Sequence, residues 1–201
     1  MPTTSDVIDT LAGIAPGSRL DTVRTLRPEA RKHAQASYVS LFEPQAPGLV
    51  TAQERFAVAS FVAGLHGRPE TNEFYLAGLK ASGASAELQA GIAAAVTAAR
   101  TTGPYGTYPK GPLSVENTAG PTYKVEADTG KVLGTRLTAA FEHVHMLVFH
   151  PRDAASPSLQ SLLDAGWSTT DIVTLSQLVA FLSFHIRVVA GLRTLAAKLS
   201  A

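Results

Sequence analysis

The residues best suited to chemistry surround a break between two helical patterns, in the stretch FVAGLHGRPETNEFY at positions 61–75. Gly67 is typical of a helix end, and Pro69 is typical of the first turn of the next helix. Arg68 would then lie at a helix N-terminus beside free backbone N–H groups. A guanidinium in that position can bind a carboxylate or a phosphate. The sequence therefore marks Arg68 as a candidate anion-binding residue.

Each residue around this break also has an ordinary structural role. Arg68 can pair with Glu70 or Glu73, which as first-turn acids complement the helix dipole. His66 can act as a general base near the turn, or it can bond the last carbonyls of its own helix. Tyr75 can donate a proton within a pocket, or it can pack at the edge of the core. The residues alone leave these alternatives open.

A second polar stretch, EHVHMLVFHPRD at 142–153, contains three histidines. On a helix His143 and His145 point about 200° apart, whereas His143 and His150 lie about two turns apart on one face. Neither pair suits one metal ion, and the chain has no HExxH or EF-hand pattern. We therefore expect no metal and no cofactor, and interpret these residues as polar-face and helix-end histidines.

The very apolar stretch FLSFHIRVV contains His185 and Arg187. A charged group buried in such a helix must be paired. Arg187 can therefore make a structural or subunit-interface ion pair, or it can anchor the carboxylate of a substrate.

The composition limits the classes of function. The 201 residues are 45% hydrophobic and 16% charged, with 17 basic and 16 acidic side chains, a formal net charge of +1. No long Lys/Arg run occurs, so we expect no nucleic-acid and no membrane-surface partner. The N-terminal residues lack the pattern of a signal peptide, and apolar runs such as LVAFL at 178–182 are too short to span a bilayer. These features predict a cytoplasmic protein.

The chain contains no cysteine. Thiol–disulfide exchange, sulfenate chemistry and cysteine metal sites all need a sulfur that this chain cannot supply. Any redox reaction would have to use another group.

The elements that position these residues are predicted to be helices. Capped segments with a period of 3.6 residues predict an all-α fold, in one domain over 1–201. A capping-box pattern at Thr51 and Glu54 predicts where the helix before the break begins. The segments 52–82 and 170–199 share a pattern. In each, a polar cap is followed by an apolar stripe that reaches a histidine, His66 in the first and His185 in the second. This similarity suggests a weak internal repeat.

One long segment, residues 101–131, has five glycines, four prolines and three tyrosines without sustained periodicity. We expect a loop there and a return to helix at Leu133. Loops of this length are usually ordered surface segments, binding loops or lids. Two alternatives remain open. The segment can be an ordered surface loop that packs on the domain or on a second subunit, or it can be a substrate lid.

Two stretches carry a resemblance to a known family. Residues 49–85, LVTAQERFAVASFVAGLHGRPETNEFYLAGLKASGAS, resemble the helix-turn-helix core of the alkylhydroperoxidase D and carboxymuconolactone decarboxylase superfamily, in its peroxidase-related branch. Residues 145–195, including DAGWS and FHIRVVAGL, are similar to the C-terminal part of one subfamily. The resemblance implies an all-α, AhpD-like helical bundle that assembles into homo-oligomers, from dimer up to hexamer.

The motif of the family is a Glu followed by Cys-x-x-Cys-x-x-x-His, in which the dithiol reduces peroxide. Aligned without gaps, the two cysteine positions fall on Arg68 and Thr71, the histidine on Tyr75 and the glutamate on Phe56. All four positions depart from the motif. Glu54 lies two residues before the glutamate position, on another helix face, so it does not inherit that role. Thiol-dependent peroxidase activity is therefore predicted to be absent.

Two functions follow from the resemblance. One is a protein nominally of the antioxidant, peroxiredoxin-type group that has become a non-peroxidase ligand-binding or partner protein. The alternative is a cofactor-independent acid–base enzyme of the decarboxylase type, which acts on a small carboxylated or lactone substrate. His66, Arg68, Thr71 and Tyr75 are the candidate catalytic residues. A closed pocket that holds His66, Arg68 and Tyr75 together would favour the enzyme.

Overall fold

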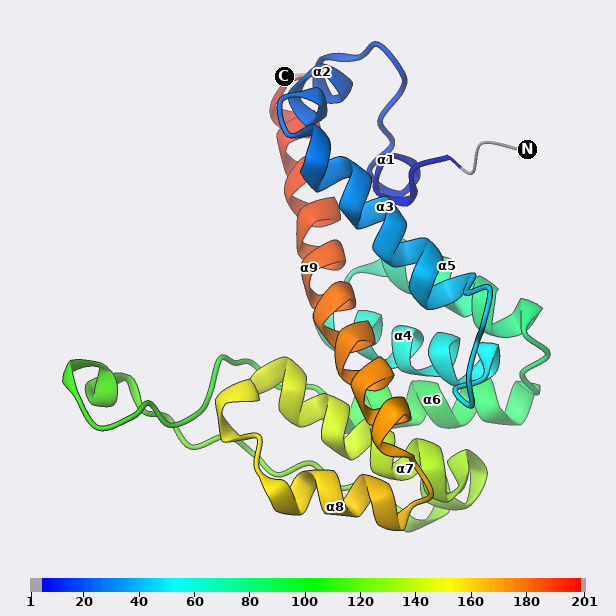
Figure 1. The fold of residues 1–201 in the computed structure, drawn as a ribbon, viewed down its shortest axis with the longest axis vertical. Helices are drawn as coiled ribbons and strands as arrows, with labels where there is room; N and C mark the ends of the chain where they lie inside the picture. The colour runs from blue at the N-terminus through cyan, green and yellow to red at the C-terminus, as the bar shows by residue number, and fades with distance from the viewer. Residues whose placement is uncertain (1–4, 200–201) are drawn as a thin grey trace.

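The computed structural model describes residues 5–199, which form helices packed around a shared core (Figure 1). The α-helices are α1 (Val7–Ala12), α2 (Arg19–Thr25), α3 (Pro28–Phe42), α4 (Ala52–His66), α5 (Pro69–Ala81), α6 (Ala86–Ala99), α7 (Ala127–Phe149), α8 (Ser156–Asp164) and α9 (Thr169–Leu199), with the 3-10 helices η1 (Pro112–Glu116) and η2 (Pro151–Asp153). Over the described residues no β-strand forms, and Gly106 and Thr118 make only an isolated antiparallel bridge. The prediction of an all-α fold is confirmed.

The corner between α4 and α5 forms where the sequence predicts it. The Thr51 side chain accepts a hydrogen bond from the Glu54 backbone, and the Glu54 carboxylate accepts one from the Thr51 backbone, so the capping box is present. Helix α4 is followed by Gly67, whose φ of 61° is in the left-handed region that favours glycine. Pro69 is the first residue of α5. Local sequence signals therefore determine this turn.

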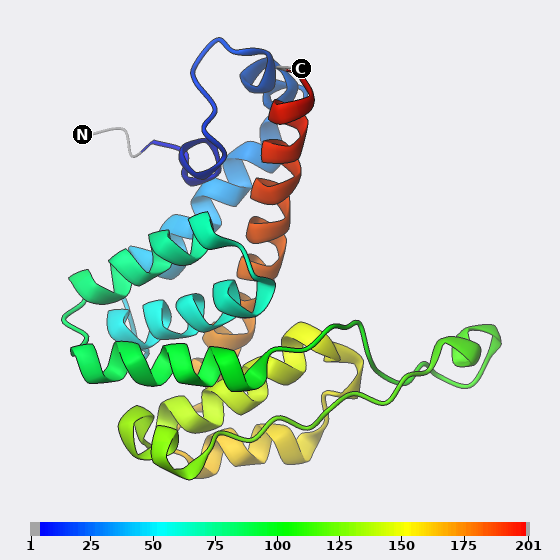
Figure 2. The ribbon, with the colours of Figure 1, turned by 180° about the vertical axis from the view of Figure 1, so that it is seen from behind.

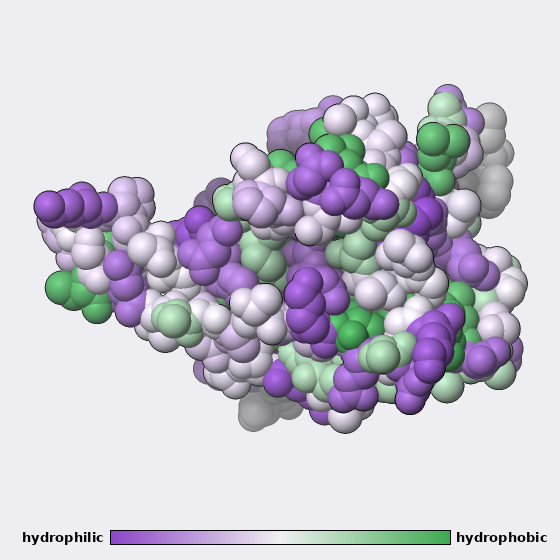
Figure 3. All heavy atoms as spheres, turned by 90° about the horizontal axis from the view of Figure 1, so that it is seen from below, coloured by the Kyte–Doolittle hydropathy of each residue, from purple (hydrophilic) through white to green (hydrophobic). Residues whose placement is uncertain are grey.

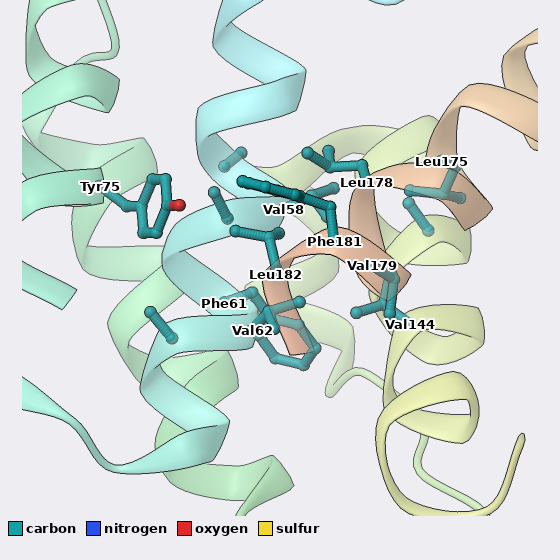
Figure 4. Packing of buried hydrophobic residues seen from close by; sticks show 14 of the residues in the cluster. Val58, Phe61, Val62, Tyr75, Val144, Leu175, Leu178, Val179, Phe181 and Leu182 are labelled. Atoms are coloured by element: carbon teal, nitrogen blue, oxygen red, sulfur yellow. The ribbon is translucent and has the colours of Figure 1, made fainter. Parts of the chain in front are cut away.

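Helix α4 lies in the centre of the core and packs on α5, α6, α7 and α9. Phe61 of α4 stacks on Phe141 of α7 with ring centroids 4.2 Å apart, and both rings are fully buried. Figure 4 shows Phe61 and Val62 packed beside side chains of α9. A Cβ at Gly78 of α5 would lie 2.1 Å from the Phe56 ring, so glycine there lets α5 approach α4 closely. The corner is thus held against the core.

Helix α9 runs along most of the molecule in Figures 1 and 2 and packs on α1, α3, α4 and α7. The expectation that no segment is apolar and long enough to span a membrane is wrong by length and composition, because this helix of 31 residues meets both criteria. Its buried residues include Leu178, Leu182 and Ile186. The core helix of a soluble protein passes the same test, and 44% of the most apolar window of α9 is buried against the rest of the molecule.

Residues 101–126 form an arm that projects from the helices and returns to them (Figures 1 and 2). The base of the arm is attached to the end of α7, where the Tyr105 backbone N–H donates to the Phe149 carbonyl at 2.8 Å. Further out, the Arg152 guanidinium lies over the Tyr108 ring, 3.8 Å from its centroid. The arm therefore has a fixed attachment and a projecting end.

The helix after the arm begins earlier than predicted. The expected loop extends to residue 131 and helix was expected from Leu133, but α7 begins at Ala127. Asp128 lies in its first turn, where a carboxylate complements the helix dipole. Gly134, with a φ of 74°, has a non-helical backbone within α7. The boundary was wrong because the helix already begins at Ala127, before this break, and continues after it.

Candidate functional site

Two of the four predicted site residues line one cavity at the α4–α5 corner. His66 ends α4, Arg68 precedes α5, and both face the middle of α9 across a cavity of about 340 Å³. We call this cavity the corner pocket; its lining residues are His66, Arg68, Ile186, Arg187, Ala190, Gly191 and Thr194. Thr71 and Tyr75 do not line it. The pocket therefore combines the predicted corner with Arg187, a residue 119 positions later than Arg68.

The corner pocket carries two positive charges that lack a carboxylate partner. Arg68 and Arg187 are both exposed, and neither makes an ion pair with a carboxylate of residues 5–199. Within the described part of the chain, the Arg187 guanidinium donates only to the Ser183 carbonyl of its own helix, at 3.1 Å. The expected pairing of Arg68 with Glu70 or Glu73 is wrong, because Glu70 bonds Arg193 of α9 at 2.8 Å. The two cations remain available to an anion.

The N-terminus of α5 adds to this positive character. No side chain caps α5, so its first-turn N–H groups are not occupied by a capping oxygen. The helix has 13 residues, and its dipole places partial positive charge at this end. Backbone and side chains thus favour an anion at the same place.

His66 is a neutral group beside the two arginines. Burial, and then the positive charges of Arg187 and Arg68, lower the pKa of its imidazole to about 4. Its Nε2 atom is buried and has no hydrogen-bond partner among the described residues. The interpretation of His66 as a cap for helix carbonyls is wrong, because its ring bonds no carbonyl among the described residues, and the Gly64 carbonyl accepts from the Gly67 N–H. The imidazole therefore retains hydrogen-bonding capacity at the pocket.

Tyr75 lies in the core, away from the corner pocket. Its side chain is fully buried, and its hydroxyl lies 3.0 Å from Nδ1 of His185, which is also fully buried. Figure 4 shows the hydroxyl pointing inward from α5. Burial raises the pKa of Tyr75 well above its usual range and lowers that of His185 to about 4. Near neutral pH the bond therefore joins a neutral phenol to a neutral imidazole.

The Tyr75–His185 bond connects the two helices that carry the arginines. Tyr75 lies about two helical turns after Arg68 in α5, and His185 lies two residues before Arg187 in α9. Thr71 has a related role, because its hydroxyl donates to the Arg68 carbonyl at 3.1 Å. We interpret Tyr75, Thr71 and His185 as positioning residues. The signal for His185 in the sequence was a polar ring in an apolar helix, which needs a buried partner.

A larger cavity of about 850 Å³ lies between α3 and α9 and is lined mainly by small and apolar side chains. Its buried cation, Arg55, is already satisfied, because the guanidinium donates to the carbonyls of Val50, Leu41 and Pro47 at 2.8 to 3.0 Å. This groove therefore lacks the unpaired charges of the corner pocket. We take the corner pocket as the candidate site.

Comparisons of the chain with family models, with curated proteins and with solved structures find no match. The function is therefore argued from the chemistry of the corner pocket. That chemistry consists of two unpaired guanidinium groups, an open helix N-terminus and a neutral imidazole.

Proposed function

We propose that this chain is a non-peroxidase ligand-binding protein with an AhpD-like helical bundle, and that it binds a small organic carboxylate in the corner pocket. The observation that carries the proposal is the pair Arg68 and Arg187, which face one cavity from two helices without a carboxylate partner. Two unpaired guanidinium groups repel each other, and an anion between them removes that repulsion. Planar guanidinium groups also match carboxylate oxygens in bidentate geometry.

The lining of the pocket is mainly polar, with a small apolar part that a carboxylate with a short carbon body can contact and inorganic phosphate cannot use. Ile186 and Ala190 provide an apolar wall, while Thr194 provides a hydroxyl. A cavity of about 340 Å³ is at the small end of the range for ligand sites in proteins. A short mono- or dicarboxylate with a few carbon atoms fits this volume and this mixture of side chains.

The alternative, an acid–base enzyme of the decarboxylase type, receives less support. It needs His66, Arg68 and Tyr75 around one substrate. Tyr75 is instead bonded to His185 inside the core, so only His66 and Arg68 reach the pocket. A proton donor opposite the imidazole is missing from the lining residues, and the binding role needs none.

We also propose that the protein is a homo-oligomer, and the arm supports this. Leu113 and Val115 at its projecting end are 52% and 89% exposed, and Figure 3 shows hydrophobic atoms at that end. Phe184 of α9 is 48% exposed as well. Apolar groups placed in this way are typical of surfaces that a second subunit covers.

Light scattering at micromolar concentration is expected to give at least a dimer, and Leu113→Glu with Val115→Glu should shift it toward monomer. A wild-type monomer would contradict the proposal.

The carboxylate proposal predicts a specific loss of affinity in two variants. Propionate, succinate and benzoate are titrated by calorimetry, with inorganic phosphate for comparison. Removal of one charged hydrogen-bond donor costs about 1.5 to 3 kcal/mol, so Arg68→Gln and Arg187→Gln should each weaken the best carboxylate by about 10- to 100-fold. Benzoate or succinate is expected to bind more tightly than phosphate.

Arg27 provides a matched control. It is exposed, and its side chain makes no capping hydrogen bond to α3. It precedes Pro28 at the start of α3, as Arg68 precedes Pro69 at the start of α5. Arg27→Gln should leave the affinity unchanged within about twofold, an ordinary surface effect. Equal losses in Arg27→Gln and Arg68→Gln, or no binding by the wild type at about 10 mM carboxylate, would refute the proposal.

A further inference from the structure

Three buried histidines line a second cavity of the protein. The cavity, of about 380 Å³, lies between α7, the start of α8 and the returning part of the arm. Its lining includes His143, His145 and His150, which are 5%, 2% and 8% exposed. His150 lies at a helix end as expected, because it follows the last residue of α7, but the interpretation of His143 and His145 as polar-face residues is wrong because both are buried. Periodicity did not reveal their burial because the arm and α8 cover this face of α7 from distant parts of the chain.

The hydrogen bonds of these histidines are incomplete. The Nε2 atom of His145 lies 3.1 Å from the Ala99 carbonyl, so it carries the proton and Nδ1 is left as an acceptor. That Nδ1 atom is buried without a partner among the described residues, as is Nδ1 of His143. Both ring nitrogens of His150 are also buried without a hydrogen-bond partner among the described residues. Its Nδ1 lies 3.2 Å from an Asp153 carboxylate oxygen, but the two groups are not aligned for a hydrogen bond. Buried polar atoms are ordinarily bonded, and these four nitrogens belong to side chains that line one cavity, so a polar ligand in the cavity is favoured.

The charges around the cavity disfavour an anion. Burial lowers the pKa of both His143 and His145, so these imidazoles are neutral near neutral pH. Lys124 is bonded to Glu142 at 2.6 Å, and Asp153 adds a second carboxylate. With His143 and His145 neutral, the charged side chains Lys124, Glu142 and Asp153 give the lining one cation and two carboxylates. A negatively charged ligand would meet net repulsion here, in contrast to the corner pocket.

A metal ion is also a poor fit. Within residues 5–199 no group of three or more His, Asp or Glu side chains is arranged so that it could hold one. The rings of His145 and His150 are 6.1 Å apart between centroids and inclined at 70°. The remaining lining consists of hydroxyl groups, such as those of Thr122 and Ser158, and apolar surface from Met146.

We propose that this cavity is a second binding site and that its ligand is a small neutral molecule rich in hydroxyl groups, a polyol or a monosaccharide. A hydroxyl donates to the free Nδ1 of His145 and accepts from a ring N–H of His143 or His150, which satisfies both kinds of histidine nitrogen at once. The carbon framework of such a molecule contacts Met146 and Tyr123, which both line the cavity. The cavity volume is sufficient for a six-carbon polyol. The proposal uses no residue of the corner pocket and stands apart from the carboxylate function.

The test follows the histidine ring resonances of the full-length protein by NMR during titration with glycerol, myo-inositol and glucose. At least one of the three is expected to shift His143, His145 and His150 along a saturating curve, with half-saturation at about 1 mM or below. His33, which is exposed on α3, and His66 should not shift. An excess of succinate, directed at the corner pocket, should not displace the polyol.

Two variants give independent readouts. His145→Phe removes the free acceptor and should weaken the polyol at least about tenfold. Since that variant replaces a buried residue, Ser158→Ala is made in parallel. Ser158 is a half-buried lining residue, and loss of its hydroxyl should weaken binding about threefold. His33→Gln is the matched control and should leave the affinity unchanged. Shifts that stay linear to about 100 mM, shifts only with succinate or ethylenediamine, or no shift at all would overturn the proposal; the last result would mean that water alone fills the cavity.

Discussion

The purified protein is expected to consume no alkyl hydroperoxide with dithiothreitol or a dihydrolipoyl reductant. A dithiol peroxidase needs one thiolate to attack the O–O bond and a second sulfur to resolve the sulfenic acid. The chain has no cysteine, and the positions aligned with the dithiol are Arg68 and Thr71. Neither side chain has a sulfur, and the Thr71 hydroxyl is bonded to the Arg68 carbonyl. Peroxide consumption should equal the buffer rate in a coupled assay on metal-free, haem-free protein.

The control for this prediction restores the thiols. In Arg68→Cys with Thr71→Cys, the two residues precede and enter the first turn of α5, where a helix N-terminus favours a thiolate. A disulfide between positions 68 and 71, detected as loss of both free thiols, would support the alignment with the family motif. Tyr75 is left unchanged, because Tyr75→His would also break its bond to His185. Sustained peroxidase turnover by the wild type would mean that the chemistry lies elsewhere in the molecule.

Replacement of Tyr75 is expected to cause the largest loss of stability. Tyr75→Ala removes a fully buried aromatic ring, which costs about 3 to 5 kcal/mol of the free energy of unfolding. Tyr75→Phe retains the ring and removes the hydroxyl, which leaves both nitrogens of His185 without a partner and costs about 1 to 3 kcal/mol. Urea unfolding monitored by circular dichroism measures both losses.

Tyr38→Phe is the matched control, because Tyr38 is also buried in the aromatic cluster and its hydroxyl makes no hydrogen bond among the described residues. Its loss should stay within about 0.5 kcal/mol. Tyr75→Phe should also weaken carboxylate binding through the spacing of α5 and α9, and Tyr38→Phe should not. Equal stability of the two variants would show that the Tyr75–His185 bond contributes nothing.

Local signals in the sequence were sufficient to predict the corner. The capping box at Thr51 and Glu54, the left-handed Gly67 and the first-turn Pro69 each depend on a few neighbouring residues. Arg68 was placed beside the N-terminus of α5 for the same reason. The all-α fold followed from periodicity, which is also a local property.

Contacts between distant parts of the chain could not be predicted in this way. Tyr75 and His185 are 110 positions apart, and nothing in either segment specifies that their side chains meet. Arg187 was recognised as a charge that needs a partner, but its place opposite Arg68 depends on how α9 crosses the corner. The proposed repeat stays a prediction: residues 52–82 form two helices with a corner, whereas 170–199 lie within the single helix α9. Amphipathic patterns alone do not distinguish these two outcomes.

The most direct test of the carboxylate site is the pKa of His66, measured by NMR with and without the best carboxylate ligand. The ring resonance is assigned with His66→Gln. In the free protein the pKa is about 4, because burial and two cations oppose protonation. A bound anion opposes these effects, so the pKa should rise toward the ordinary value of 6.5, and affinity should increase as the pH falls through that interval. In the double variant Arg68→Gln with Arg187→Gln the free pKa should be higher than in the wild type and should no longer respond to the ligand. A carboxylate that binds the wild type without moving the pKa of His66 would contradict the account.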